Sequence, residues 1–165
     1  MTAKIGIDIG GVISDKLSDT PGAERDPEGF LRATPIDGAI EAIARLGHEG
    51  FETSRMFLVS KCGWNMQLKT RLWLRAINFY GRTGVPIDQV WFCLKRSDKA
   101  GICQTLGITH FVDDRLEILG QLRTVRHKFL FRPNPSEVMR YVNSLPLVTR
   151  VENWNDAEQA IEATL

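Results

Sequence analysis

Residues 4–14 read Lys-Ile-Gly-Ile-Asp-Ile-Gly-Gly-Val-Ile-Ser, an apolar strand that runs into a carboxylate, Asp8, and then into two glycines. Isoleucine favours a β-strand, and Gly10 and Gly11 let the backbone turn sharply and approach a ligand closely. A carboxylate at the carboxyl end of a strand stands where open α/β sheets bind their ligands. Such an acid can ligate Mg²⁺ or attack an electrophile. The stretch therefore predicts an α/β fold with a site at Asp8.

The chain has 165 residues, a formal net charge of +1 and a hydrophobic content of 43%. A chain of this length buries about 70% of its unfolded surface, so we expect one self-sufficient domain over residues 1–165. The balanced charge gives no overall attraction to nucleic acid or to a membrane. Three widely spaced cysteines indicate reduced thiols rather than a disulfide framework. Because no signal peptide or membrane span is visible, we expect a cytoplasmic protein.

Strand-like and helix-like segments alternate along the rest of the chain. Apolar segments predict strands at 56–60, 89–94, 109–112, 127–131 and 147–151. The expected helices cover 35–48, 66–80, 98–106, 115–122 and 135–144. A last helix is expected to open at Asn155, with Glu158 completing a capping box. This alternation predicts a three-layer, Rossmann-like parallel sheet with helices on both faces, and the polar segment 14–34 predicts a flap over the site.

Chemically active side chains follow four of these strands. Asp8 follows the first strand, Ser60 ends the next, Lys99 opens the helix after the third, and Asp113 and Asp114 end the fourth. Right-handed crossovers would gather them on one edge of the sheet. Together they would supply a nucleophile, a hydroxyl donor, an ammonium and metal-binding carboxylates, which Mg²⁺-dependent phosphoryl transfer requires.

The order of these motifs resembles the haloacid dehalogenase-like (HAD) superfamily. The matching stretches are Asp8-Ile9-Gly10-Gly11-Val12-Ile13, Phe57-Leu58-Val59-Ser60, Ser97-Asp98-Lys99-Ala100 and Phe111-Val112-Asp113-Asp114. The resemblance covers residues 4 to about 132. It implies a HAD-like fold, a Mg²⁺ cofactor, and a phosphatase that acts on a phosphorylated substrate through an aspartyl-phosphate. The implied nucleophile is Asp8, the phosphate ligands are Ser60, Lys99 and Gly11, and the metal ligands are Asp8, Gly10, Asp113 and Asp114.

One position departs from the pattern of the family's phosphatases. They carry an Asp two residues after the nucleophile, where this chain has Gly10. That acid protonates the leaving oxygen and later activates water, so its loss costs roughly 10²–10⁴-fold in rate unless another group replaces it. Asp15 and Asp19, in the flap, are candidate replacements.

Two alternatives to a phosphatase remain open. One is a phosphate-binding or protein-interaction module of HAD-like type whose catalysis has decayed. The other is carbon–halogen or carbon–phosphorus cleavage, because related dehalogenases and phosphonate-cleaving members also lack the acid that Gly10 replaces.

Ordinary structural roles compete for several residues. Lys99 lies in a charged segment, so a solvated cluster, or Lys95 as the phosphate ligand, is the alternative. Arg115 is expected to balance the acidic pair that it follows. Trp64 is expected to pack, with stacking on a nucleobase or sugar as the alternative. The histidines lack metal-ligand spacing and are expected to pack or cap; they are His48, His110 and His127.

The spacers between the motifs leave no room for a substantial cap domain. The first spacer holds one loop and one helix, and the segment between Ser60 and Lys99 holds one helix and one strand. We therefore expect an open site, which suits a large phosphorylated substrate or closure by a second subunit of a homo-oligomer. The 14–34 flap is the expected substrate-selecting element.

Overall fold

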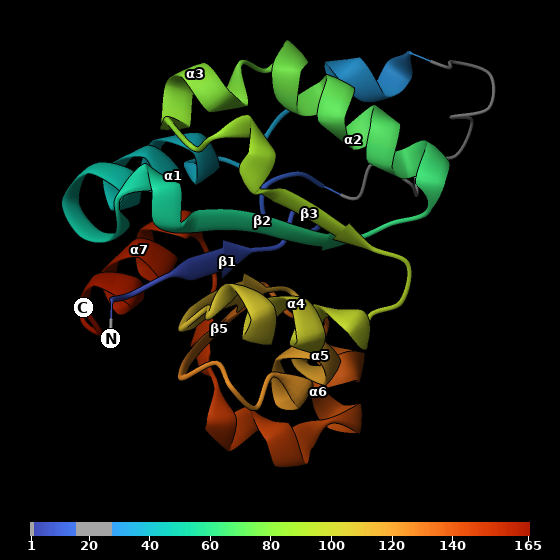
Figure 1. Ribbon diagram of the computed structural model, residues 1–165. Coiled ribbons are helices and arrows are strands. Elements are labelled where there is room, and N and C mark those ends of the chain that lie inside the picture. The colour runs from blue at the N-terminus through green and yellow to red at the C-terminus, as the bar shows by residue number, and fades with distance from the viewer. Residues whose placement is uncertain (1, 16–27) are drawn as a thin grey trace.

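Six parallel strands form the centre of the molecule, with helices above and below them (Figure 1). The computed structural model describes residues 2–15 and 28–165. The strands are β1 (Ile5–Ile7), β2 (Met56–Lys61), β3 (Val90–Cys93), β4 (His110–Asp113), β5 (His127–Phe131) and β6 (Thr149–Val151). They lie in the order β3-β2-β1-β4-β5-β6, and all neighbouring pairs are parallel. The predicted three-layer parallel α/β fold is confirmed.

The helices connect successive strands across the two faces of the sheet. They are α1 (Ala39–Leu46), α2 (Trp64–Ala76), α3 (Phe79–Thr83), α4 (Asp98–Leu106), α5 (Leu116–Gln121), α6 (Pro135–Arg140) and α7 (Trp154–Glu162). Shorter 3-10 or π turns are η1 (Gly29–Arg32), η2 (Gly47–Phe51), η3 (Thr53–Arg55), η4 (Ile87–Gln89) and η5 (Val142–Leu147). None of the helices in the described ranges combines the length and the apolar character that a bilayer span requires.

Side chains of each strand alternate between two apolar cores, as the two-residue period of a strand requires. Ile7 and Leu58 point into the core shared with α1, α2, α3 and α7. Val59 and Phe111 point into the core shared with α4 and α5. Gly6 also faces this second core, where an added Cβ would lie 2.5 Å from the Phe111 ring. Both faces of the sheet are covered, which explains why its strands read as continuous apolar runs.

The chain reverses its direction of travel across the sheet between β1 and β4. From β1 it runs through β2 to the edge strand β3, and it then returns to β4 on the other side of β1. Doubly wound sheets bind their ligands in the crevice at the carboxyl ends of two such strands. Asp8 directly follows β1 and Asp113 ends β4, so the topology brings both carboxylates to this crevice.

Helix boundaries differ from prediction where local backbone geometry intervenes. The single helix predicted over 66–80 is two helices, because Asn78 between α2 and α3 adopts the left-handed conformation with φ 53°. The helix predicted over 135–144 ends at Arg140, and the 3-10 turn η5, which contains Pro146, follows it.

The predicted cap of the last helix is wrong. Asn153, not Asn155, is the N-cap, and its side-chain oxygen accepts a hydrogen bond from the Asp156 N–H at 2.9 Å. Glu158 does not cap the helix. It is buried, and its Oε1 lies 2.6 Å from Nε of Arg45 in α1. The sequence offers the Asn-x-x-acid spacing twice, and only the extended backbone at Asn153 decides between them.

The predicted flap lies partly outside the described residues, which omit 16–27. Of its described part, Ser14 forms a β-bridge with Pro35, and η1 contacts α2. The indole of Trp73 donates a hydrogen bond to the Ala33 carbonyl at 2.8 Å and fixes this end of the segment. Within the described ranges, the segments between β1 and β3 hold helices and short turns around β2, so no large cap domain is present there.

Candidate active site

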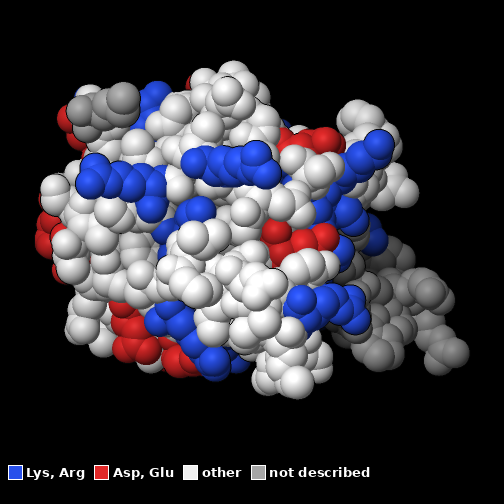
Figure 2. Space-filling view, turned by 90° about the horizontal axis from the view of Figure 1, so that it is seen from below, with Lys and Arg blue, Asp and Glu red and all other residues white. Residues whose placement is uncertain are grey.

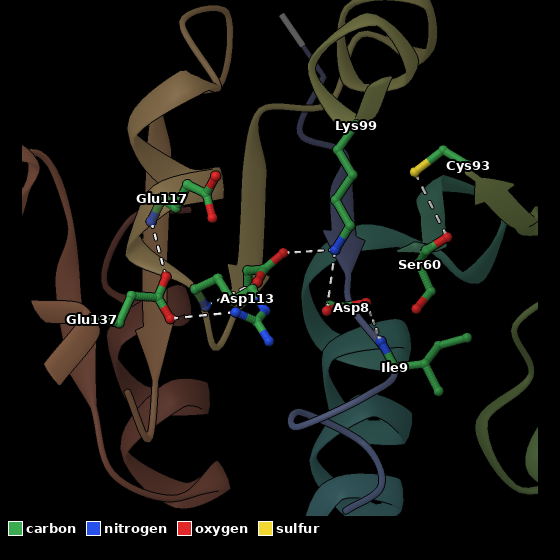
Figure 3. A network of polar contacts seen from close by, with 9 residues as sticks. Asp8, Ile9, Ser60, Cys93, Lys99, Asp113, Glu117 and Glu137 are labelled. Carbon is green, nitrogen blue, oxygen red and sulfur yellow. Dashed lines mark hydrogen bonds and ion pairs between the residues drawn. The ribbon is translucent and has the colours of Figure 1, made fainter. Parts of the chain in front are cut away.

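A buried lysine joins the two carboxylates at the crevice between β1 and β4 (Figure 3). The Nζ atom of Lys99 lies 3.1 Å from Oδ2 of Asp8 and 2.7 Å from Oδ2 of Asp113. Lys99 is 1% exposed and Asp113 is 0% exposed. Because an unpaired buried charge is strongly destabilising, each of these groups depends on the others. Lys95, the alternative, is exposed, so it is Lys99 that reaches the carboxylates.

The first turn of α4 positions this lysine. α4 begins at Asp98, and Gly107 ends it in the left-handed conformation with φ 67°. Lys99 then extends over the Phe111 ring of β4, with its ammonium 5.6 Å from the ring centroid. The side chain thus packs its apolar stem in the second core while its charge reaches the crevice.

Burial and charge pairing shift the pKa values of both partners. Burial alone would lower the pKa of Lys99, but the Asp113 and Asp8 carboxylates more than offset it, so the pKa is raised above its ordinary value. Burial raises the pKa of Asp113 above its ordinary value, and repulsion from Asp8 and Asp114 adds to this shift, whereas the Lys99 ammonium opposes it. Lys99 is therefore cationic at neutral pH, and the carboxyl groups around it outnumber this one ammonium.

Three carboxylates are close enough to share one cation. Asp8, Asp113 and Asp114 each offer an oxygen, and these oxygens lie within 4.8 Å of one another. A donor set made only of carboxylate oxygens suits Mg²⁺. Two backbone N–H groups fix the carboxylates: Ile9 donates to Oδ1 of Asp8 at 2.8 Å, and Arg115 donates to Oδ1 of Asp113 at 2.9 Å.

The two glycines after Asp8 have different roles. Gly11 adopts φ +83°, and an added Cβ would lie 2.6 Å from Oδ2 of Asp114. Only glycine therefore lets the backbone at this position run past the Asp114 side chain without a clash. An added Cβ at Gly10, in contrast, has no heavy atom within 4 Å. Position 10 has space for a side chain that this sequence does not supply.

A cavity of about 330 Å³ opens over these groups. Its walls include the predicted Asp8, Gly10, Ser60, Lys99 and Asp114. Asp113, which is fully buried, does not line it, and neither does Gly11. The remaining lining residues are Ile9, Ser14, Lys61, Cys62, Met66, Thr70, Arg96, Arg115 and Ile118.

The sequence pattern did not identify several polar residues of the cavity wall, among them Ser14, Lys61 and Arg96. Ser14 is fully buried there, and its hydroxyl has no hydrogen-bond partner in the part of the chain that the structure describes. Lys61 directly follows Ser60, and Arg96 precedes Lys99 by three residues. Their closeness in sequence to the predicted site residues was the available signal.

Trp64 contradicts the expectation that it packs, because it is 74% exposed. It begins α2, and Leu68 and Leu72 continue the same exposed stripe at four-residue spacing. Met66 and Thr70, on another face of α2, line the cavity. Trp64 therefore points away from the site.

Arg115 contacts the first acid of the pair through its backbone, because its N–H donates to Oδ1 of Asp113 at 2.9 Å. Its side chain instead pairs with Glu137, with Nη1 3.7 Å from Oε2. Of the candidate replacement acids, Asp15 is exposed and does not line the cavity, and Asp19 lies outside the described residues.

The histidines and cysteines do not build a metal site among the described residues. His110 is buried and stacks on His127, with ring centroids 4.6 Å apart, so its predicted packing role is confirmed. His48 is exposed. All three cysteines are free thiols, and burial raises the pKa of Cys62 to about 11 and that of Cys103 to about 12.

Comparison with known proteins gives a structural match only. No protein-family model and no curated protein sequence matches this chain. Its structure resembles the crystal structure of a protein from Burkholderia xenovorans that is assigned to the haloacid dehalogenase-like hydrolases. The two share a TM-score of 0.67 and 14% sequence identity, and the match covers 99% of each chain. At this identity the similarity shows a common HAD-like α/β fold.

Proposed function

We propose that this protein is a Mg²⁺-dependent hydrolase of HAD-like type, a phosphatase that acts through an aspartyl-phosphate on Asp8. The observation that carries the proposal is the contact of Lys99 with both Asp8 and Asp113, where Lys99 and Asp8 line a cavity. A buried lysine between two acids, with a third acid within 4.8 Å, is a costly arrangement unless a cation and an anion bind there together.

Asp8, Asp113 and Asp114 would hold the metal ion, with the Gly10 carbonyl as a further ligand. Mg²⁺ bound there would polarise the phosphoryl group and balance the excess of carboxylates over ammonium. The tether of Asp8 to the Ile9 N–H leaves Oδ2, the oxygen next to Lys99, as the atom for attack.

In the first step, Oδ2 of Asp8 forms a bond to phosphorus while the bond from phosphorus to the leaving oxygen breaks. The leaving oxygen keeps the electron pair of that bond. Lys99 and the Ser60 hydroxyl would stabilise the charge on the transferring group. The Gly11 N–H donates instead to the Ser14 carbonyl at 2.7 Å. In the second step, water attacks the same phosphorus, and Asp8 leaves as a carboxylate.

Substrates should differ in rate according to how much protonation their leaving group needs. Within the described residues, Asp8 and Asp114 are the only acids that line the cavity, and the proposal assigns both to other roles. Residue 10, from which a proton donor would reach the leaving oxygen, is a glycine and has no side chain. We therefore expect acyl and aryl phosphates, whose leaving groups need little protonation, to react faster than alkyl phosphates.

The same gap at Gly10 favours the second candidate function, a HAD-like phosphate-binding or protein-interaction module without catalysis. Turnover of acetyl phosphate and p-nitrophenyl phosphate with Mg²⁺ separates the two. The phosphatase proposal expects turnover that Asp8→Asn abolishes, and an acid-stable mass adduct on Asp8 during turnover. No turnover of either substrate, together with retained vanadate binding, would support the binding module. Release of halide from a haloacid, or of inorganic phosphate from a phosphonate by cleavage of its carbon–phosphorus bond, would indicate the third chemistry.

A further inference from the structure

Two arginines at the cavity wall have no role in the proposed chemistry. Arg96 lies between β3 and α4, and Arg115 directly precedes α5. Both line the same cavity as Asp8 and Lys99. They come from opposite sides of the crevice, because β3 and β4 lie on opposite sides of β1 in the sheet.

Each guanidinium is paired with a glutamate that does not line the cavity. Nη1 of Arg96 lies 3.8 Å from Oε2 of Glu117, and Nη1 of Arg115 lies 3.7 Å from Oε2 of Glu137. Oε1 of Glu137 also accepts the backbone N–H of Glu117 at 3.2 Å (Figure 3). Each arginine thus forms an ion pair with one of two glutamates, on α5 and α6, and a hydrogen bond links these two glutamate residues.

These ion pairs leave donors of the guanidinium groups for a ligand. Close charge-assisted hydrogen bonds measure about 2.7–2.9 Å, and both pairs are longer than this. A guanidinium carries five N–H donors in a fixed fork that matches the oxygens of a phosphate or carboxylate. A glutamate that pairs with one side of a guanidinium orients it and leaves the N–H donors of the other side for a ligand.

We propose that Arg96 and Arg115 form a second anion-binding subsite, which receives an anionic group of the substrate beyond the transferred phosphoryl group. The inference rests on the proposed function and names its substrate class: a phosphate ester or anhydride whose leaving part carries a further phosphate or carboxylate. The cavity of about 330 Å³ supports this. It falls within the range of about 300–1,000 Å³ that is usual for small-molecule sites, so it holds more than one phosphoryl group.

The helical face next to the site argues for a small second anion rather than a long polyanion. On the face that carries α4, α5 and α6, Lys and Arg side chains are interspersed with Asp and Glu (Figure 2). A long nucleic-acid strand requires a continuous basic track. The two arginines are a local feature.

Binding of non-hydrolysable probes to the full chain in excess Mg²⁺ tests the subsite. Methylphosphonate carries one anionic group, methylenebisphosphonate two phosphoryl groups, and phosphonoacetate a phosphoryl and a carboxylate group. Calorimetry is expected to give about tenfold or tighter binding for at least one two-group probe than for methylphosphonate. Which of the two binds tighter identifies the second group as phosphate or carboxylate.

Arginine variants then test whether Arg96 and Arg115 cause the tighter binding of the two-group probes. In Arg96→Gln/Arg115→Gln the affinity ratio between two-group and one-group probes is expected to fall below about threefold. The matched control Arg75→Gln/Arg123→Gln removes two exposed charges away from the cavity and should keep the ratio. If the double variant does not fold, Arg96→Gln alone, whose side chain is 43% exposed, serves in its place with a partial loss.

The outcomes separate this inference from the proposed function. An unchanged ratio in the arginine variant, or equal affinity of the original protein for all probes, overturns the subsite, whether or not phosphate esters are hydrolysed. Equal loss of one-group and two-group binding also overturns it, because the arginines would then serve the transferred group itself. Arginine-dependent binding of two-group probes, with no hydrolysis of any phosphate ester, keeps the subsite and refutes the phosphatase.

Discussion

Lys99 and Asp113 meet at 2.7 Å in a buried contact, although one lies in the first turn of α4 and the other ends β4. Neither charge is stable in that position without the other. The contact therefore links the packing of α4 against the sheet to the electrostatics of the site. Asp8 joins it at 3.1 Å, so the loop after β1 is held to the same point.

Removal of the buried ammonium is expected to destabilise the fold. Lys99→Met should lower the free energy of unfolding by about 3–5 kcal/mol without divalent cations, because it leaves buried carboxylates uncompensated. Addition of Mg²⁺ should recover part of the loss. Urea denaturation with and without Mg²⁺ measures both effects. Lys95→Met, at an exposed position, is the matched control and should change stability by less than about 0.5 kcal/mol.

Mg²⁺ is expected to stabilise the original protein through the three carboxylates. At a concentration tenfold above its Kd, the ion should add about 1.4 kcal/mol to the free energy of unfolding. Asp114→Asn should abolish most of this gain, whereas Asp88→Asn, at an exposed site outside the cavity, should keep it. Thermal unfolding over a Mg²⁺ titration provides the measurement. Equal stabilisation of both variants would show that the ion binds elsewhere.

The open space at Gly10 predicts that an acid fits there. Gly10→Asp should fold with a stability within about 1 kcal/mol of the original, because an added Cβ meets no heavy atom within 4 Å. It should raise turnover of alkyl phosphates by roughly 10²–10⁴-fold, since it supplies the missing proton donor. Steady-state kinetics with an alkyl and an aryl phosphate give the test. Gly10→Asn, which has a similar shape but no titratable proton, is the control and should show no gain.

Gly11 is expected to tolerate no side chain. Gly11→Ala combines a positive φ with an approach of 2.6 Å to Oδ2 of Asp114, so the loop or the acid must move. The expected cost is about 1–3 kcal/mol, together with weaker Mg²⁺ binding. Denaturation and metal titration of this variant, beside Gly63→Ala at an open position, show whether the effect is specific. An Ala variant that matches the original in both would contradict the geometry at Gly11.

His110 is expected to make the fold sensitive to acid. Burial, and repulsion from His127, lower its pKa to about 4 from an ordinary 6.5. The unfolded state therefore takes up the proton more readily, and stability that is complete above pH 6.5 is lost as the pH falls toward 4, by roughly 3 kcal/mol. His110→Phe should flatten this dependence between pH 7 and 4.5 in denaturation experiments. His48→Gln, at an exposed site, should keep the original slope.

Much of the fold followed from local patterns. The helix 98–106 and the strand 127–131 lie at the predicted bounds, because strong apolar patterns and a terminal glycine mark them. The break at Asn78 and the cap at Asn153 escaped prediction, since both depend on backbone angles that the residue types permit but do not require. The expectation that Trp64 packs was wrong, because the orientation of α2 leaves its side chain exposed.

Residue patterns alone predict the alternation of strands and helices, and with it the edge of the sheet to which Asp8, Ser60, Lys99 and Asp113 belong. Strand periodicity and the right-handed crossover are local and topological rules, so they can be applied without coordinates. Three further features became visible in the folded molecule: Lys99 rather than Lys95 reaches the acids, Arg96 and Arg115 line the cavity wall, and Gly10 faces open space. These depend on distances between side chains far apart in the chain, which packing sets and no local pattern encodes.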